Sequence, residues 1–263
     1  MDKNYTGEYL FELNDDQSSY NAELVLAAAR LVLPSEHLGM PVTRVWAGEI
    51  GAENRLEVKE VVVPQGIDSL EGALFECFSS LVSISLPESL DYLGSECIVG
   101  CPSLREISVD PENKKYKSID GSLYSKDGSV LVRVADGRVG SCFELPSGVV
   151  SIADNAFRGC HTLSRVRLPD TLAEIGASAF SECVSLERVS LPRGLERIGN
   201  FAFSGCRSLS KISIPDTVER IGHDLFMGAS ENICICCEKD VPGGSWEDDW
   251  CGETARAFFG LKT

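Results

Sequence analysis

The 263-residue chain carries 40 acidic and 24 basic residues, giving a formal net charge of −16, and 43% of its residues are hydrophobic. This acidity opposes general binding to nucleic-acid phosphates, which needs clustered Lys and Arg, and it opposes docking on an anionic membrane. The hydrophobic content is sufficient for a core, and the odd number of cysteines, 11, excludes complete internal pairing.

The first 30 residues combine aromatic side chains with many acids. The start, MDKNYTGEYLFELNDDQ, has neither the basic residues nor the apolar stretch of a secretory signal, so the chain as given is expected to be cytoplasmic. The longest apolar run, Leu24–Leu33, is interrupted by Arg30 and is too short to span a bilayer, so no membrane insertion is expected. We expect residues 1–30 to form an N-terminal cap over the region that follows.

A 23-residue unit repeats along most of the chain. A Leu-Pro or Ile-Pro dipeptide marks each unit, and its proline recurs every 23 residues at Pro146, Pro169, Pro192 and Pro215, as it does from Pro64 to Pro87. The segment before it, for example Leu186–Leu191, alternates at period two, which is typical of a short strand with one buried face. We therefore predict a right-handed solenoid of about eight repeats over residues 31–237, an α/β repeat of short parallel strands with turns or short helices.

The second half of each unit is expected to turn back towards the core. Gly199 permits a close approach of neighbouring backbone that a Cβ would obstruct. The stretch Asn200–Phe203 is predicted to form a helical turn that places Ala202 and Phe203 inside. No single unit can bury its own apolar edge, so neighbouring units must stack and share a core.

Four cysteines occupy the same phase of the repeat. Stacking is expected to place them in a column inside the solenoid, where a small apolar thiol packs well. Disulfides and metal ligation by the column are the alternatives. The four residues are Cys101, Cys160, Cys183 and Cys206.

The repeat is interrupted near the middle of the chain. The step from Pro111 to Pro146 is 35 residues, 12 longer than the regular unit. Within it, Ser122–Tyr124 and Val130–Val132 flank Lys126-Asp127-Gly128, and Asp-Gly accepts the positive φ of a tight hairpin turn. The sequence predicts a β-hairpin insertion at about residues 111–140 that projects from the solenoid or interrupts its stacking.

The C-terminal part carries a cysteine cluster and several aromatics. Cys234, Cys236, Cys237 and Cys251 are the only candidate for metal or redox chemistry, but strong zinc signals use C-x₂₋₄-C pairs, usually twice. The favoured interpretation is a final strand, in which Cys234 and Cys236 share one face, with metal binding as the alternative. Residues 238–263 are predicted to form a C-terminal cap covered by aromatics, namely Trp246, Trp250, Phe258 and Phe259.

The outward positions of the predicted strands point to a binding surface. Four basic residues gather there over three consecutive repeats of an otherwise acidic chain, and solenoids use such a concave surface for recognition. They are predicted to receive an anionic partner, an acidic peptide or a glycan; the alternative is a solvated face paired with Glu144 and Glu187. The four residues are Arg165, Arg167, Arg188 and Lys211.

No catalytic constellation is evident in the sequence. The three histidines fall in separate units, the carboxylate pairs Asp15-Asp16 and Asp248-Asp249 are merely adjacent in apparent loops, and no phosphate loop or dinucleotide fingerprint occurs. We assign no catalytic residue, no metal and no cofactor. The histidines are His37, His161 and His223.

Four parts of the sequence carry a family resemblance, namely the repeat LPxxLxxIGxxAFxxCxSLxxV, the insertion VDPENKKYKSIDGSLYSKDGSVLVRV and the segments LPSEHLGMPVTRV and PGGSWEDDW. Together they resemble the BspA-like leucine-rich-repeat family over roughly residues 30–250. The resemblance implies adhesion or protein recognition without enzymatic activity, at the bacterial cell surface or secreted, although no secretion signal is visible. We therefore predict a non-enzymatic protein that binds a protein or glycan. A hydrolase using an unrecognised carboxylate pair and a cysteine-based metal-binding protein are the alternatives, and the sequence assigns no oligomeric state.

Overall fold

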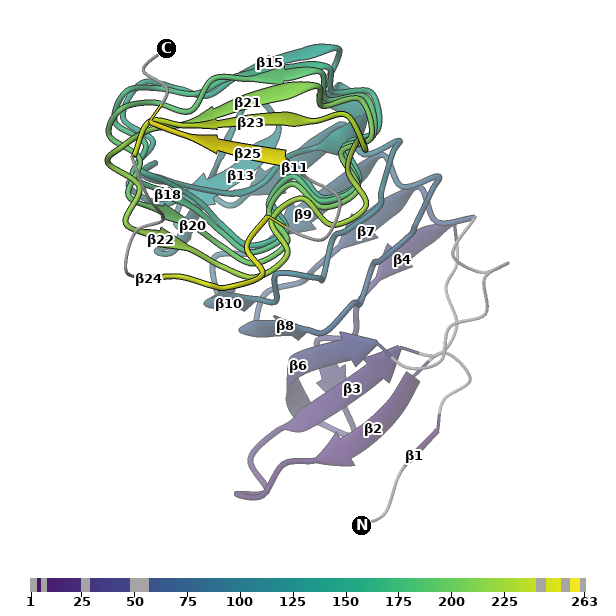
Figure 1. The fold of residues 1–263 in the computed structure, drawn as a ribbon. Coiled ribbons are helices and arrows are strands. Elements are labelled where there is room, and N and C mark those ends of the chain that lie inside the picture. The colour runs from purple at the N-terminus through teal and green to yellow at the C-terminus, as the bar shows by residue number, and fades with distance from the viewer. Residues whose placement is uncertain are drawn as a thin grey trace. The chain divides into compact units, whose positions relative to one another are not determined.

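The computed structural model describes residues 4–5, 9–24, 29–47, 57–239, 245–251 and 256–260 of the chain. The described residues form a β-solenoid of about nine turns, and within these ranges the one helical segment is the 3-10 turn η1 (Asp136–Arg138). Figure 1 shows the course of the chain, which divides into two compact units. Unit 1 comprises Met1–Lys126 and Ala135–Arg138, and unit 2 comprises Asp127–Val134 and Val139–Thr263.

Unit 1 contains two strand series. Its first strands pair antiparallel, β1 with β2 and β2 with β3, whereas β3 pairs in parallel with β6 and the series continues in parallel through β8 to β10. This series comprises β1 (Asn4–Tyr5), β2 (Tyr9–Leu13), β3 (Tyr20–Leu24), β6 (Met40–Ala47), β8 (Ser69–Glu71) and β10 (Tyr92–Leu93), with β5 (Glu36–His37) beside β6. The second series, entirely parallel, comprises β4 (Arg30–Val32), β7 (Glu60–Val62), β9 (Ser83–Leu86) and β11 (Glu106–Val109).

Unit 1 also holds the start of the predicted insertion. Strands β12 (Tyr116–Ile119) and β13 (Ser122–Ser125) pair antiparallel across Asp120-Gly121, whose φ angles of 48° and 75° suit a tight turn. A hairpin therefore forms across Asp120-Gly121, a turn that was not predicted from the sequence, and the predicted pairing across Lys126-Asp127-Gly128 stays a prediction. The later strand, β14 (Val130–Arg133), belongs to unit 2 and pairs in parallel with β16, and the projecting insertion stays a prediction.

A buried asparagine connects this region to the preceding coil. Asn113 is fully buried, and its Nδ2 donates to the carbonyl oxygens of Pro87 at 2.8 Å and Leu90 at 2.9 Å. Its Oδ1 accepts hydrogen bonds from the backbone amides of Lys115 and Tyr116, both at 2.8 Å. One side chain thus satisfies polar groups of two successive segments, which explains why a polar residue is tolerated in this core.

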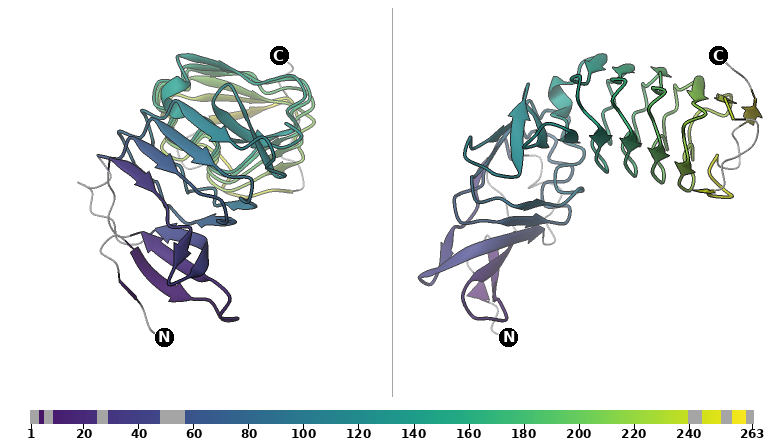
Figure 2. Two further views of the ribbon diagram at one scale, coloured as in Figure 1. Left: turned by 180° about the vertical axis from the view of Figure 1, so that it is seen from behind. Right: turned by 90° about the vertical axis from the view of Figure 1, so that its left-hand side faces the viewer.

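Unit 2 is a regular stack of coils with two parallel strand series (Figure 2). Each strand pairs with the equivalent strand one coil along, so the predicted short parallel strands are confirmed. One series comprises β14, β16 (Ser151–Ile152), β18 (Glu174–Ile175), β20 (Arg197–Ile198), β22 (Arg220–Ile221) and β24 (Ser245–Trp246). The other comprises β15 (Cys142–Glu144), β17 (Arg165–Arg167), β19 (Arg188–Val189), β21 (Lys211–Ile214), β23 (Cys234–Cys237) and β25 (Arg256–Phe259).

The predicted helical turn at Asn200–Phe203 is wrong. The segment forms turns instead, because Phe201 has a φ of 56°, outside the helical region, and its amide donates to the carbonyl of His223 in the next coil. The amide of Phe203 likewise donates to the carbonyl of Leu225. The amides of Phe201 and Phe203 therefore join neighbouring coils, while Ala202 and Phe203 are fully buried as predicted.

The cysteine column of unit 2 is buried, as the repeat phase predicts. Cys160, Cys183 and Cys206 are at most 2% exposed, and the thiols of Cys183 and Cys206 donate to the carbonyls of Phe157 and Phe180 at 3.2 and 3.1 Å. Burial raises the pKa of Cys206 to about 12. In unit 1, Cys101 is equally buried and its thiol donates to the carbonyl of Phe75. These thiols therefore act as small packing groups.

Two further predictions concern the ends of the chain. Trp246 and Trp250 are buried and their rings lie 5.0 Å apart, but Phe258 is 49% exposed, so the aromatic cover is incomplete on that strand. The bounds of the caps, residues 1–30 and 238–263, stay predictions. No helix in the described part of the chain is long and apolar enough to cross a bilayer.

Candidate partner-binding surface

Three of the four predicted partner-binding residues form a column across neighbouring strands. Arg165 on β17 is in register with Arg188 on β19, which is in register with Lys211 on β21, and all three are exposed. Adjacent strands in a sheet lie about 4.8 Å apart, so the three cations follow one another at short intervals. We call these three residues the basic column.

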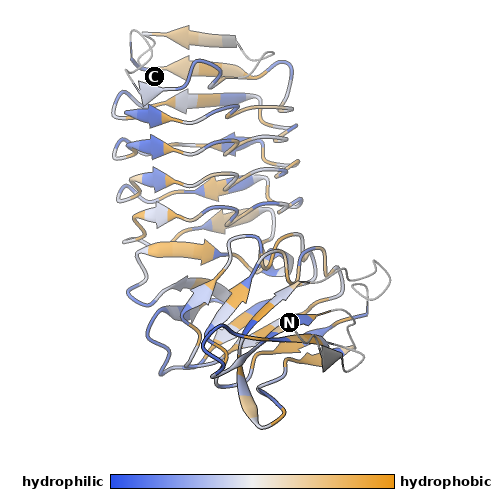
Figure 3. Cartoon of the chain, turned by 90° about the horizontal axis from the view of Figure 1, so that it is seen from below, coloured by the Kyte–Doolittle hydropathy of each residue, from blue (hydrophilic) through white to orange (hydrophobic). Residues whose placement is uncertain are grey.

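The alternating strand pattern turns this column outward. Val166, Val189 and Ile212 each follow a member of the column and are buried, because successive side chains of a strand point to opposite faces. The strands of unit 2 accordingly carry both hydrophobic and hydrophilic positions (Figure 3). The outward placement predicted from the repeat is therefore confirmed for these positions.

Arg167, the fourth predicted residue, has a different environment. One guanidinium nitrogen lies 3.2 Å from a carboxylate oxygen of Glu144 on the neighbouring strand, and both side chains are largely exposed. This is the solvated pairing that the alternative interpretation expects, and such exposed pairs contribute about 0–1 kcal/mol. By contrast, the described residues include no ion pair between a carboxylate and a member of the basic column.

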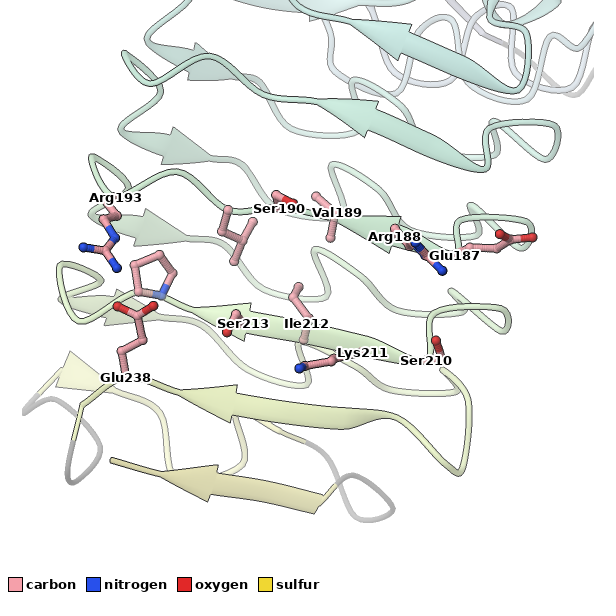
Figure 4. Close-up of a pocket in the computed structure, with 12 residues that line it drawn as sticks. Glu187, Arg188, Val189, Ser190, Arg193, Ser210, Lys211, Ile212, Ser213 and Glu238 are labelled. Atoms are coloured by element: carbon pink, nitrogen blue, oxygen red, sulfur yellow. The ribbon is translucent and has the colours of Figure 1, made fainter. Parts of the chain in front are cut away.

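A groove of about 620 Å³ runs over strands β19 and β21 beside the column. Arg188 and Lys211 lie towards one end, and Arg193 and Glu238 lie at the other (Figure 4). Glu187 and three serines, whose hydroxyls can donate hydrogen bonds, complete its polar lining; the serines are Ser190, Ser210 and Ser213. Three cations against two carboxylates, together with hydroxyl donors, suit an anionic ligand group.

Arg193 and Glu238 are not apparent from the sequence, because both lie outside the outward strand positions of the repeat. A second basic pair of unit 2 was also not predicted: Arg197 on β20 is in register with Arg220 on β22. These two residues line a separate hollow of about 450 Å³. A guanidinium nitrogen of Arg197 lies 3.8 Å from a carboxylate oxygen of Glu174. The repeated Glu-Arg-Ile-Gly at 196–199 and 219–222 is the signal that would have found this pair.

The cysteine cluster is split between two faces of β23. The Sγ atoms of Cys234 and Cys236 lie 3.9 Å apart on one face, as predicted, whereas Cys237 is buried on the other. The strand is not the final one, because β25 pairs with its other side. Among the described residues, no group of three or more His, Cys, Asp or Glu side chains is placed to hold a metal ion.

Among the residues that the structure describes, the titratable groups outside the basic column form no catalytic arrangement. His223 and His161 are exposed, as predicted. His37 stacks on Phe11, with 3.8 Å between the ring centroids. Asp68 lines an open, acidic hollow of about 670 Å³ in unit 1, and its pKa is raised, first by burial and then by Asp91 and Glu71. Its carboxylate lies at the surface, unlike the enclosed acid of a general acid–base site.

The comparisons with known proteins agree with this fold. The model of the BspA type leucine rich repeat region matches residues 52–129 and 141–238 in six copies. The structure of the pneumococcal vaccine antigen PcpA is similar with a TM-score of 0.64 at 16% identity, covering 91% of this chain and 82% of that one. No curated protein sequence matches.

Two further solved structures are similar. A leucine-rich repeat protein from Eubacterium ventriosum has a TM-score of 0.57 at 16% identity, over 89% of this chain and 77% of that one. A leucine rich cell surface protein from Faecalibacterium prausnitzii has a TM-score of 0.51 at 18% identity, over 90% of this chain and 88% of that one. At these identities the likeness concerns the fold alone.

The protein is thus a leucine-rich-repeat β-solenoid. Because the family model matches more than half of its residues, the chain belongs to the BspA-type leucine-rich-repeat family, whose members are typically surface-associated bacterial repeat proteins.

Proposed function

We propose that the protein is a non-enzymatic binding protein whose basic column and adjacent groove receive an anionic segment of a protein or glycan partner. The observation that carries the proposal is the run of three in-register cations in a chain of net charge −16. Like charges held about 4.8 Å apart repel one another, and a bound anion relieves that repulsion.

The groove supports the same function. A partner lying over β19 and β21 contacts Arg188 and Lys211 together with the hydroxyls of Ser190 and Ser213. Charge-assisted hydrogen bonds from arginine to carboxylate or sulfate are among the stronger polar contacts, and they fix the orientation of a ligand. Arg167, already paired with Glu144, is the least available of the four predicted residues.

The family supports a role in adhesion or host interaction. One similar structure is described as a cell surface protein and another as a vaccine antigen, both of bacterial origin. We extend a surface location to this chain as part of the proposal, with protein or glycan recognition as its activity.

Binding to defined anionic probes tests the proposal. Synthetic polyglutamate and a sulfated glycan are titrated against the protein and against the double variant Arg165→Glu/Arg188→Glu, by fluorescence anisotropy at several salt concentrations. We expect at least one probe to bind the parent protein with an affinity that falls as salt rises, because salt screens exposed charges. In the variant that affinity falls by roughly tenfold or more, about 1.4 kcal/mol.

The other strand series offers a matched control. Arg197→Glu/Arg220→Glu makes the same change of net charge in unit 2, on strands β20 and β22. We expect this variant to retain most of the affinity, since its substitutions lie away from the column. Equal losses in the two variants indicate attraction by net charge alone and contradict the assignment of the surface, as does unchanged affinity in both.

A further inference from the structure

Two cysteines of β23 form a close thiol pair at the surface of unit 2. The Sγ atoms of Cys234 and Cys236 lie 3.9 Å apart, because residues two apart in a strand place their side chains on the same face. Cys234 is partly exposed, whereas Cys236 is 6% exposed. The pair therefore has one member that a reagent can reach and one directly beside it.

The neighbouring strand places a cation beside the pair. On β21, Lys211 is in register with Cys234, and Ser213 is in register with Cys236. Burial raises the pKa of Cys236, while the positive charge of Lys211 opposes that shift. A nearby ammonium favours the thiolate, which is the reactive form of cysteine.

The backbone geometry permits the two thiols to join. A strand rises about 3.3 Å per residue, so the Cα atoms of residues two apart are separated by about 6.6 Å. That separation lies within the range found for disulfides, about 4.4–6.8 Å, near its upper end. A disulfide also needs Cβ atoms about 3.5–4.5 Å apart, so closure requires a local bend of β23 between Cys234 and Cys236 in addition to rotation of the two side chains.

We propose that Cys234 and Cys236 are a thiol modification site that reacts with low-molecular-weight disulfides and closes to an intrastrand disulfide. The Cys234 thiolate attacks one sulfur of the reagent, forms a mixed disulfide and releases the first reagent thiol. Cys236 then loses its proton and attacks Sγ of Cys234, which releases the second thiol. The protein loses two electrons and two protons, and the reagent disulfide is reduced to two thiols.

Two other cysteines of unit 2, Cys237 and Cys142, differ from this pair in reach or in neighbours. Cys237 faces the interior from the same strand, and burial raises its pKa to about 12. Cys142 is exposed, but its register partner on the next strand is Arg165. Cys237 is therefore expected to stay reduced, and Cys142 is expected to stop at a mixed disulfide.

Mass spectrometry tests the proposal directly. Trypsin releases residues 221–239 as one peptide that contains Cys234, Cys236 and Cys237. The folded protein is treated with glutathione disulfide, the remaining thiols are blocked with N-ethylmaleimide after unfolding, and the peptide is weighed. We expect one maleimide group, no glutathione and a loss of two hydrogens, and we expect reduction with dithiothreitol to restore three maleimide groups.

Three variants assign the bond. Cys237→Ser is expected to keep the disulfide, so its peptide carries no maleimide. Cys236→Ser is expected to stop with glutathione on Cys234, and Cys234→Ser is expected to leave Cys236 blocked by maleimide. A parent peptide with three maleimide groups after the oxidation step, or a disulfide that survives in Cys234→Ser, overturns the proposal. This test does not depend on the proposed partner binding.

Discussion

The rings of Phe180 and Phe203 lie 5.3 Å apart and within 1° of parallel, and both are fully buried. The two residues are 23 positions apart, the length of one repeat, so each coil presents the same ring to the next. Phe157 and Phe226 extend the stack at 4.8 and 5.9 Å. Aromatic contact between coils is therefore a direct consequence of a constant repeat length.

Truncation of this stack should destabilise unit 2. Phe203→Ala removes a ring that contacts a neighbour on each side, and a buried Phe→Ala change typically costs about 3–5 kcal/mol. Urea unfolding followed by circular dichroism measures the loss. Phe258→Ala, at a position 49% exposed, is the matched control and is expected to change stability much less. Similar losses of stability in the two variants would contradict a stabilising contribution from the stack of rings.

Gly199 is required because neighbouring backbone lies against it. A Cβ at this position would lie 2.5 Å from the amide nitrogen of Ala177, closer than real Cβ contacts allow. We therefore expect Gly199→Ala to destabilise the protein by about 1–3 kcal/mol, measured by thermal unfolding. Gly140→Ala is the control: no atom lies within 4 Å of its added Cβ, and we expect stability to be unchanged or to rise by about 0.4–1 kcal/mol.

The repeat made much of this fold predictable, because position within a 23-residue unit determines burial. The inward placement of Phe203 and Cys183 and the outward placement of Arg188 follow from phase alone. The hydrogen bonding of the turns does not follow from the phase of the repeat. At Phe201 the backbone has a φ of 56° and the amide donates to the next coil, and the spacing of buried side chains does not distinguish this turn from a helical one.

The candidate site was predictable only in part for a related reason. Comparing equivalent strand positions identifies Arg165, Arg188 and Lys211, since register follows the repeat. It names Glu144 as a possible partner but does not decide which of the four cations pairs with it, because that depends on side-chain rotamers. The same comparison does not identify Glu238, because this residue lies just after a strand rather than within one, although it lines the groove.

Asn113 should be among the least tolerant polar positions of unit 1. Asn113→Ala removes one hydrogen-bond partner from the carbonyls of Pro87 and Leu90 and from two backbone amides in a fully buried site. We expect a loss on the order of 3 kcal/mol, because each buried unsatisfied group costs about 1–3 kcal/mol and solvent entry recovers part of that.

Two further variants check this account of Asn113 in the same urea experiment. Asn113→Asp retains the acceptor for the amides of Lys115 and Tyr116 but turns a carboxylate towards carbonyl oxygens, so it should be at least as damaging as alanine. Asn232→Ala, at an exposed position, should be nearly neutral. A neutral Asn113→Ala would show that the hydrogen bonds of this side chain are dispensable.

The last described coil of unit 2 should be pH-dependent through His223. Its Nδ1 lies 2.8 Å from a carboxylate oxygen of Asp249, and this hydrogen bond raises the pKa of His223 above its usual 6.5, helped by the charges of Asp249, Glu247 and Asp224. Because the folded pKa is the higher one, the stabilising contribution is complete below the unfolded value and is lost as pH rises through the folded value.

Thermal unfolding from about pH 5, above the range in which carboxylates protonate, to pH 8 measures this dependence. The melting temperature of the parent should exceed that of His223→Gln at the acidic end, and the difference should shrink as pH rises. Nuclear magnetic resonance titration should show a lower His223 pKa in Asp249→Asn than in the parent, since the largest cause of the shift is removed. His161→Gln, which alters an exposed histidine elsewhere in unit 2, controls for the loss of a histidine as such. If the difference in melting temperature between the parent and His223→Gln instead grows as pH rises, the linkage has the opposite sign and the proposed interaction is excluded.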